Sequence, residues 1–133
     1  MADSDEVSDE IRLALKTINR AWLSANPSAV KRALVSSFHP QMIIKDAQLK
    51  TVASGRKACA QSYVDFIQQA QVFSFEQGEP DIHVYRDSAI ASYEWRIAYV
   101  LGGLNYNEHG IDIFVFVRSE KKWQAVWRAM LGL

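Results

Sequence analysis

Two carboxylates are the residues of this sequence best placed to do chemistry. Asp112 lies between Ile111 and Ile113, in a run that otherwise has the composition of a buried strand. A buried carboxylate without a partner is costly, and burial favours its protonated form. Three roles stay open for Asp112: a structural carboxylate bonded to Arg128, Trp22 or a backbone N–H; a polar group in a pocket; or a catalytic acid.

The second carboxylate, Asp46, ends the short apolar run 42–44 that continues through Lys45 and precedes a polar loop. A carboxylate in this position serves either as a turn or cap acceptor or as a general base at the mouth of a pocket. Both interpretations of Asp46 stay open.

Other reactive side chains give weaker patterns. The three histidines (His39, His83 and His109) lack metal-ligand spacing, so we expect no metal site. Cys59 falls on the apolar side of a predicted helix, which favours packing over a nucleophilic role. The sequence has no glycine-rich phosphate loop, and we expect no cofactor.

The composition indicates a globular chain without bulk charge. Of the 133 residues 49% are hydrophobic, and Lys+Arg and Asp+Glu number 15 each, so the net charge is zero and a nucleic-acid partner is not expected. No apolar run approaches the ~20 residues that span a membrane. We expect a disordered acidic tail over 1–7 and one domain over 8–133. The absence of signal-peptide features in 1–10 and the single cysteine favour a cytoplasmic location.

The first half of the chain predicts three helices. Ile11, Leu15, Ile18 and Trp22 recur at helical spacing. A second helix begins at Asn26-Pro27, because Asn is a good N-cap and Pro fits the first helical position, and it ends by His39-Pro40. Gly55 opens a third helix. Short strands are expected over 42–46, 72–76 and 81–85.

The last third of the chain predicts three antiparallel strands, over 87–101, 104–118 and 123–131. Between the first two, Gly102-Gly103 supplies the positive φ of a tight hairpin turn. A two-residue turn fixes the register, so that Trp95 faces Gly110 and Tyr93 faces Asp112. Helices segregated from an antiparallel sheet define an α+β fold.

This register gives the sheet two apolar faces. One is aromatic with a lone carboxylate, and its members are Tyr93, Trp95, Tyr99, Asp112, Phe114, Phe116, Trp123 and Trp127. The other is aliphatic with charges at its margin, and its members are Ile90, Ile111, Ile113, Val115, Val117, Val126, Glu94, Arg96 and Arg128. A one-residue change in the second turn would move Arg128 across to Asp112. Helices cover one face, and we expect a second copy of the chain to cover the aliphatic face.

The order of elements and several motifs resemble the nuclear transport factor 2-like superfamily, in particular its polyketide-cyclase-like and ketosteroid-isomerase-like branch of small bacterial proteins. The motifs are Phe38-His39-Pro40, Asp46 followed nine residues later by Gly55-Arg56, the run 110–116 and the run 123–128. The resemblance implies a cone-shaped fold, or cystatin-like roll, in which a curved antiparallel sheet wraps around three helices. It also implies a pocket at the open end and a homodimer through the outer sheet face.

Within this resemblance Asp46 takes the position of the general base of the ketosteroid isomerases, and Asp112 that of the carboxylic acid that donates to an oxyanion. Where those enzymes carry a tyrosine on the first helix, the nearest counterpart is Trp22. A pocket in this fold would be lined by Trp22, Tyr63, Phe66, Tyr93, Trp95, Tyr99, Phe114 and Trp127. Two hypotheses follow: a cofactor-independent isomerase, cyclase or dehydratase of a small carbonyl compound, or a non-catalytic module that binds a small apolar molecule or assembles the chain.

Overall fold

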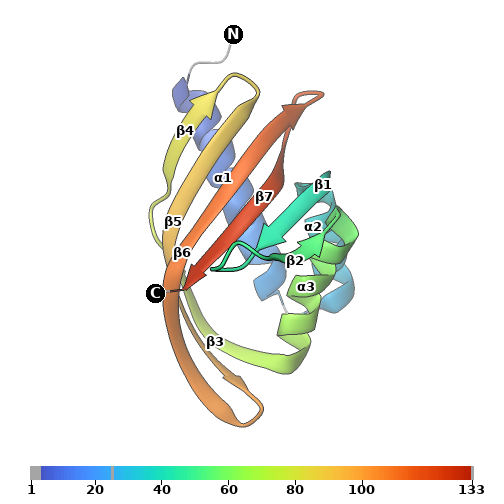
Figure 1. The fold of residues 1–133 in the computed structure, drawn as a ribbon, viewed down its shortest axis with the longest axis vertical. Helices are drawn as coiled ribbons and strands as arrows, with labels where there is room; N and C mark the ends of the chain where they lie inside the picture. The colour runs from blue at the N-terminus through green and yellow to red at the C-terminus, as the bar shows by residue number, and fades with distance from the viewer. Residues whose placement is uncertain (1–3, 25, 133) are drawn as a thin grey trace.

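The computed structural model describes residues 4–24 and 26–132. Three helices and seven strands follow one another in the order α1 (Ser4–Leu23), α2 (Pro27–Ser37), β1 (Phe38–Lys45), β2 (Thr51–Ser54), α3 (Arg56–Gln69), β3 (Ala70–Gln77), β4 (Asp81–Tyr85), β5 (Ser88–Leu101), β6 (Leu104–Ser119) and β7 (Lys122–Gly132). Figure 1 shows the long strands β5, β6 and β7 side by side, with α1 crossing behind them. The predicted α+β class is confirmed.

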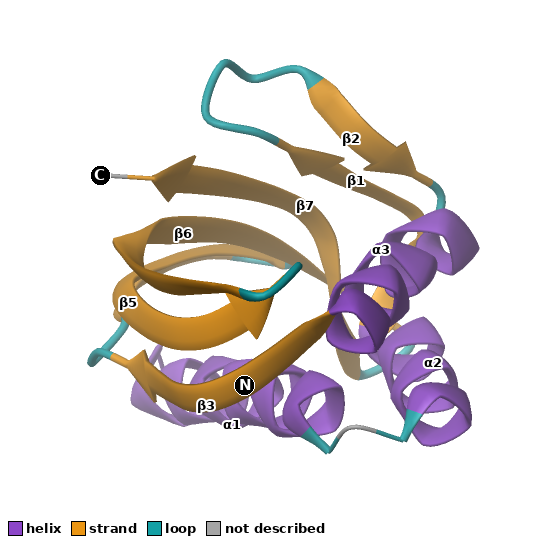
Figure 2. Ribbon diagram, turned by 90° about the horizontal axis from the view of Figure 1, so that it is seen from below, coloured by secondary structure: helices purple, strands orange, loops and turns teal. Residues whose placement is uncertain are grey.

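The strands form one curved sheet in the order β2-β1-β7-β6-β5-β3, with β4 paired to β5. Every pairing is antiparallel except that of β1 with β7, which is parallel and brings Ile44 beside Arg128. Helix α3 contacts β1, β2 and β3, which lie toward opposite edges of the sheet. In Figure 2 the sheet curls around an interior that α3 closes from one side.

The predicted register of the central hairpin is confirmed. Leu101 pairs with Leu104, Trp95 with Gly110 and Tyr93 with Asp112, and Gly102 and Gly103 have φ values of 60° and 79°. Along β6 buried positions alternate with half-buried ones from Gly110 to Val117. The buried side chains face the helices, whereas the aliphatic residues between them form the outer face of the sheet.

The start of α2 follows the predicted cap, whereas the start of α1 corrects an expectation. Asn26 accepts a hydrogen bond from the Ala29 backbone N–H, and Pro27 is the first residue of α2. Residues 1–7 were expected to be a disordered tail, but α1 begins at Ser4 and Val7 is buried in the core. Burial of Val7 and acidic residues in the first turn both stabilise this helical start. Residues 1–3 of the predicted tail lie outside the described residues.

Gly110 allows β5, β6 and β7 to pack tightly at one point. A Cβ on Gly110 would meet the Leu131 carbonyl oxygen and come within 2.6 Å of the Trp95 indole. The indole therefore covers the space that a side chain would need, as the register predicts. A bare backbone at this position lets neighbouring strands approach and the sheet bend.

Substitution Gly110→Ala is expected to lower the free energy of unfolding by ~1–3 kcal/mol, because the added methyl group collides with backbone as well as with a side chain. Urea unfolding followed by circular dichroism measures the change. Gly132→Ala in β7 is the matched control, since a Cβ there meets nothing within 4 Å, and its effect is expected to stay within about 0.5 kcal/mol. Equal losses from the two substitutions would contradict the role of Gly110.

Candidate functional site

A cavity of about 290 Å³ opens between α1, α3 and the inner face of the sheet. Its walls are mostly apolar and aromatic, with a few polar groups. The lining residues are Asn19, Trp22, Val52, Ser62, Tyr63, Phe66, Phe75, Trp95, Ile97, Tyr99, Glu108, Asp112, Arg128 and Met130. Such a composition is typical of small-molecule sites.

The aromatic walls pack against one another mainly edge to face. The Trp22 ring lies 5.0 Å from that of Phe75 at an interplanar angle of 78°, and Phe66 meets Tyr99 at 5.2 Å and 74°. These geometries are the favourable ones for aromatic pairs, so the rings hold each other in place.

An ion pair forms the floor of the cavity. Arg128 Nη2 lies 2.9 Å from Asp112 Oδ2, and the two side chains are 15% and 2% exposed. The same carboxylate oxygen accepts the Tyr93 hydroxyl at 2.9 Å. Arg128 Nη1 donates to the Tyr63 hydroxyl at 2.6 Å. Two other atoms of this pair, Asp112 Oδ1 and Arg128 Nε, have no hydrogen-bond partner among the described residues.

The floor continues into a hydrogen-bonded network that reaches α1. Asn19 Nδ2 donates to the Tyr93 hydroxyl at 3.3 Å and to Gln77 Oε1 at 2.6 Å. Trp22 Nε1 donates to Asn19 Oδ1 at 2.9 Å. These bonds fix which group donates to which: the Tyr93 hydroxyl accepts a hydrogen bond from Asn19 and donates one to Asp112.

Burial and this pair govern the ionisation of the neighbouring groups. Burial raises the pKa of Tyr63 to about 12, although Arg128 opposes the shift. Burial and the Asp112 carboxylate raise the pKa of Tyr93 well above its ordinary value. For Arg128, burial alone would lower the pKa, but the Asp112 carboxylate and Tyr63 raise it above the ordinary value. All three groups therefore keep their protons at neutral pH.

A β-bulge places Arg128 on the inner face. The register between β6 and β7 shifts between Val115 and Phe116, where Ala125 pairs with Phe116 but Trp127 pairs with Val115. Val126 is the extra residue, so alternation reverses after it and Arg128 comes to lie opposite Phe114. The sequence pattern, which assumed unbroken alternation from Trp123, had placed Arg128 on the other face.

The predicted aromatic lining is only partly assembled. Trp22, Tyr63, Phe66, Trp95 and Tyr99 line the cavity, whereas Tyr93, Phe114 and Trp127 do not. Tyr93 and Phe114 are buried beneath the floor, with their rings stacked at 6.3 Å. Trp127 is moved to the outer face by the same bulge that brings Arg128 inward.

Asp46 lies outside the cavity. Its Oδ1 atom accepts the backbone N–H groups of Gln48 and Lys50 at 2.9 and 3.0 Å, and it is not among the lining residues. Asp46 thus orders the turn between β1 and β2, which corrects the expectation of a general base. Asp112 forms an ion pair with Arg128. The cavity therefore does not contain the expected pair of an ionised base at Asp46 and a protonated acid at Asp112.

A third carboxylate, missed in the sequence, lies at the mouth of the cavity. Glu108 accepts the Tyr99 hydroxyl at 2.6 Å, and both residues line the cavity. Burial, and then Glu108, raise the pKa of Tyr99 to about 12. The alternation of β6 contains the signal for Glu108, since it shares one face with Gly110 and Asp112. Asn19 was also missed, although it lies three residues before Trp22 on the same helical face.

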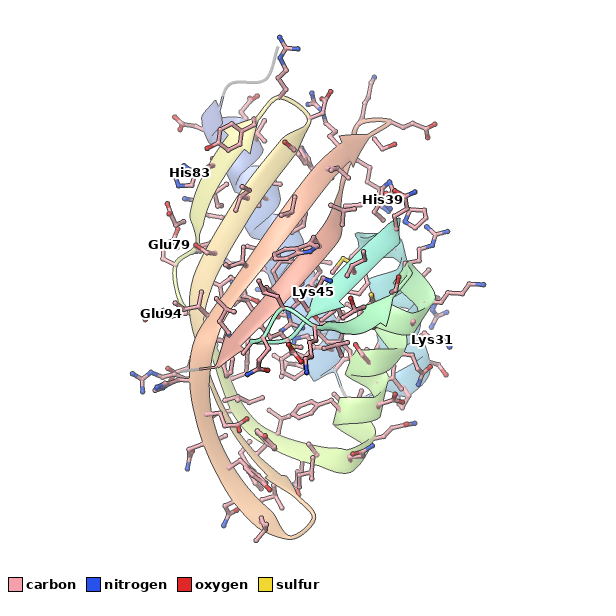
Figure 3. The ribbon with its side chains drawn as sticks, viewed as in Figure 1. Lys31, His39, Lys45, Glu79, His83 and Glu94 are labelled. Carbon is pink, nitrogen blue, oxygen red and sulfur yellow. The ribbon has the colours of Figure 1, made fainter. Side chains whose placement is uncertain are left out.

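The histidines do not contribute to this cavity. His39 and His83 lie far apart at the periphery (Figure 3), and His109 faces outward beside Arg96. Within residues 4–24 and 26–132, no three His, Cys, Asp or Glu side chains come together as they would around a metal ion. No helix in the same ranges combines the length and apolar character needed to cross a bilayer.

Substitutions Asp112→Asn and Arg128→Met are each expected to lower the free energy of unfolding by about 3 kcal/mol, because each leaves a buried charge without its counter-ion. The double substitution is expected to cost less than the sum of the two, as urea titrations of all four proteins would show. Glu79→Gln, which breaks the exposed pair with Arg12, is the control and is expected to cost under about 1 kcal/mol. Additive losses at Asp112 and Arg128 would contradict the coupling.

Comparison with known proteins identifies the fold. No protein-family model and no curated protein sequence matches this chain. Similar solved structures include a nuclear transport factor 2-like superfamily protein from Salmonella enterica serovar Typhimurium, with 18% identity, a TM-score of 0.81 and coverage of 98% of this chain and 93% of that one. Another, from Streptomyces avermitilis, is provisionally assigned as a dehydratase of the same family, with 15% identity, a TM-score of 0.81 and coverage of 98% and 99%.

A ketosteroid isomerase-like protein from Erwinia carotovora atroseptica has 14% identity, a TM-score of 0.74 and coverage of 94% of this chain and 95% of its own. The TM-scores establish a shared fold. Sequence identities this low carry no function across, so the function of this chain is argued from the residues of its site. The curved sheet, the three helices that close it and these likenesses together show that the chain has the nuclear transport factor 2-like fold.

Proposed function

We propose that this chain binds a small, mostly apolar molecule in the cavity and does not use Asp46 and Asp112 as an acid–base pair. The observation that carries the proposal is the Asp112–Arg128 ion pair at the floor of an aromatic-walled cavity. A guanidinium at 2.9 Å stabilises the ionised form of a carboxyl group, whereas donation to an oxyanion needs the protonated form. The expectation of a protonated acid depended on the absence of a nearby cation, and that condition is not met.

The rest of the lining supports binding over proton transfer. The described lining residues include no His, Cys or Lys, and their titratable groups are Tyr63, Tyr99, Glu108, Asp112 and Arg128. The two tyrosines have raised pKa values of about 12, which makes them poor bases near pH 7. The cavity volume of about 290 Å³ lies close to the lower end of the usual range for small-ligand sites.

The neutral probe 1-naphthalenemethanol is expected to bind with a stoichiometry of one per chain and a Kd on the order of 100 μM in isothermal titration calorimetry. Its rings would contact the aromatic walls, and its hydroxyl group would meet the polar floor. Substitution Ile97→Trp, which adds bulk inside the cavity, is expected to abolish binding.

Leu13→Trp is the matched control, because Leu13 is 63% exposed on α1 and is not part of the lining. It is expected to leave the Kd unchanged. If the wild-type chain gives no binding heat with this probe at millimolar concentration, or if Ile97→Trp binds as well as the wild type, the proposed cavity site is wrong.

We also propose a homodimer through the outer face of the sheet. Its aliphatic residues Ile111, Ile113, Val115, Val117 and Val126 are half-buried in the single chain, and Ile90 is 40% exposed. The helices cover the opposite face, so a second copy is the occupant that would cover this one. Glu94 and Arg96 project from the same face with opposite charges, which suits a twofold contact in which each surface meets its own copy.

Light scattering coupled to size exclusion is expected to give the mass of a dimer at about 50 μM chain. Substitution Val115→Glu is expected to give a monomer, because each chain would have to bury a carboxylate in an apolar interface. Leu104→Glu at the exposed tip of the β5–β6 hairpin is expected to leave the dimer intact. A monomeric wild-type chain would contradict the proposed interface.

A further inference from the structure

The charges that line the cavity do not cancel. Three described lining residues have acidic or basic side chains: Glu108, Asp112 and Arg128. Arg128 is the one cation among them, and both of its terminal nitrogens are engaged, Nη2 with Asp112 and Nη1 with the Tyr63 hydroxyl. The lining therefore carries a formal charge of one negative unit, although the whole chain is neutral.

The floor of the cavity suits a polar ligand group but favours neither a positive nor a negative one. The Asp112–Arg128 pair is neutral as a unit, and it leaves one acceptor, Asp112 Oδ1, and one donor, Arg128 Nε, without hydrogen-bond partners in the described structure. Asp112 is 2% exposed, so an isolated ion entering here would meet both signs of charge at once. A neutral hydroxyl or amide group suits this end of the cavity.

The uncompensated charge lies at the mouth. Glu108 forms no ion pair among the described residues, and its carboxylate accepts a hydrogen bond from the Tyr99 hydroxyl at 2.6 Å. That short bond orients the carboxylate, and Tyr99 itself is packed between Tyr106 at 5.0 Å and Phe66 at 5.2 Å. A carboxylate fixed in this way keeps acceptor positions free for a ligand.

Aromatic ring faces beside this carboxylate also favour a cation. The π-face of an aromatic ring attracts ammonium and guanidinium groups. The protein already uses such faces at the floor, where the Arg128 guanidinium lies 5.1 Å from the Tyr63 ring centre and 5.5 Å from that of Phe114. At the mouth, none of the cations in the described part of the chain lies over the rings of Tyr99 or Phe66.

We infer that the ligand of this cavity is an organic cation: an apolar body that carries a protonated amine, bound with its ammonium group beside Glu108 at the mouth. The inference rests on the proposed binding function and specifies its ligand class. Apolar rings fill the aromatic walls, the ammonium group donates to Glu108, and anionic molecules of the same shape are excluded by the same carboxylate.

Three probes of one shape and different charge test the inference by calorimetry at pH 7: 1-naphthalenemethylamine, 1-naphthalenemethanol and 1-naphthoate. The amine is expected to bind at least about tenfold more tightly than the carboxylate, with the alcohol between them. Raising the salt concentration is expected to narrow these differences, because the mouth is exposed to solvent.

Substitution Glu108→Gln keeps the size of the side chain and an acceptor for Tyr99 but removes the charge. It is expected to weaken amine binding about fivefold and to weaken alcohol binding by a clearly smaller factor. Asp65→Asn on α3 is the matched control: it makes the same change in net charge at an exposed carboxylate outside the lining, and amine affinity is expected to stay constant.

The outcomes separate the two proposals. If the alcohol binds but the amine and the carboxylate bind equally, or if Glu108→Gln and Asp65→Asn have the same effect, the cationic ligand class is wrong and the cavity site stands. If the alcohol does not bind at millimolar concentration, the proposed function fails and the inference fails with it.

Discussion

A buried ion pair between β6 and β7 holds the inner part of this molecule together. Two charges removed from water cost several kcal/mol each, and only good geometry and further hydrogen bonds offset that cost. Here the offset comes from many elements at once, because Asp112 and Arg128 are bonded through Tyr93, Asn19, Gln77 and Tyr63 to β5, α1, β3 and α3. The cavity floor is therefore a shared structure, and a change in one of these elements alters the contacts of the others.

The ion pair depends in turn on one irregular residue. Without the bulge at Val126, β7 would alternate evenly from Trp123, and Trp127 would point inward in place of Arg128. The floor would then combine a large aromatic ring with a carboxylate that has no cation beside it. That is the environment in which a carboxylic acid stays protonated, so the backbone of β7 decides which chemistry Asp112 can support.

The parts of this fold that could be predicted are those determined by residues close together in the sequence. Gly102-Gly103 fixes a tight turn, and the period of two then carries the register as far as Gly110 and Asp112. The bulge at Val126 has no glycine or proline to mark it, so the face of Arg128 could not be predicted. The role of Asp46 depends on where the backbone N–H groups of the following loop point. Glu108 could have been found, because the alternation that reveals Asp112 includes it.

The parallel pairing of β1 with β7 has a consequence for the order in which the chain can fold. All other strand pairs join segments that are near one another in sequence or linked through the central hairpin. In contrast, β1 is the first strand of the sheet to be synthesised, and its partner β7 follows all other strands. Until β7 is present, β1 has only the four-residue β2 to pair with. Closure of this long loop brings a large entropic cost and slows assembly. We therefore expect the edge of the sheet formed by β1 and β2 to dock late in folding, so that Phe38, Met42 and Ile44, which are buried in the folded chain, stay accessible to a chaperone until β7 is in place.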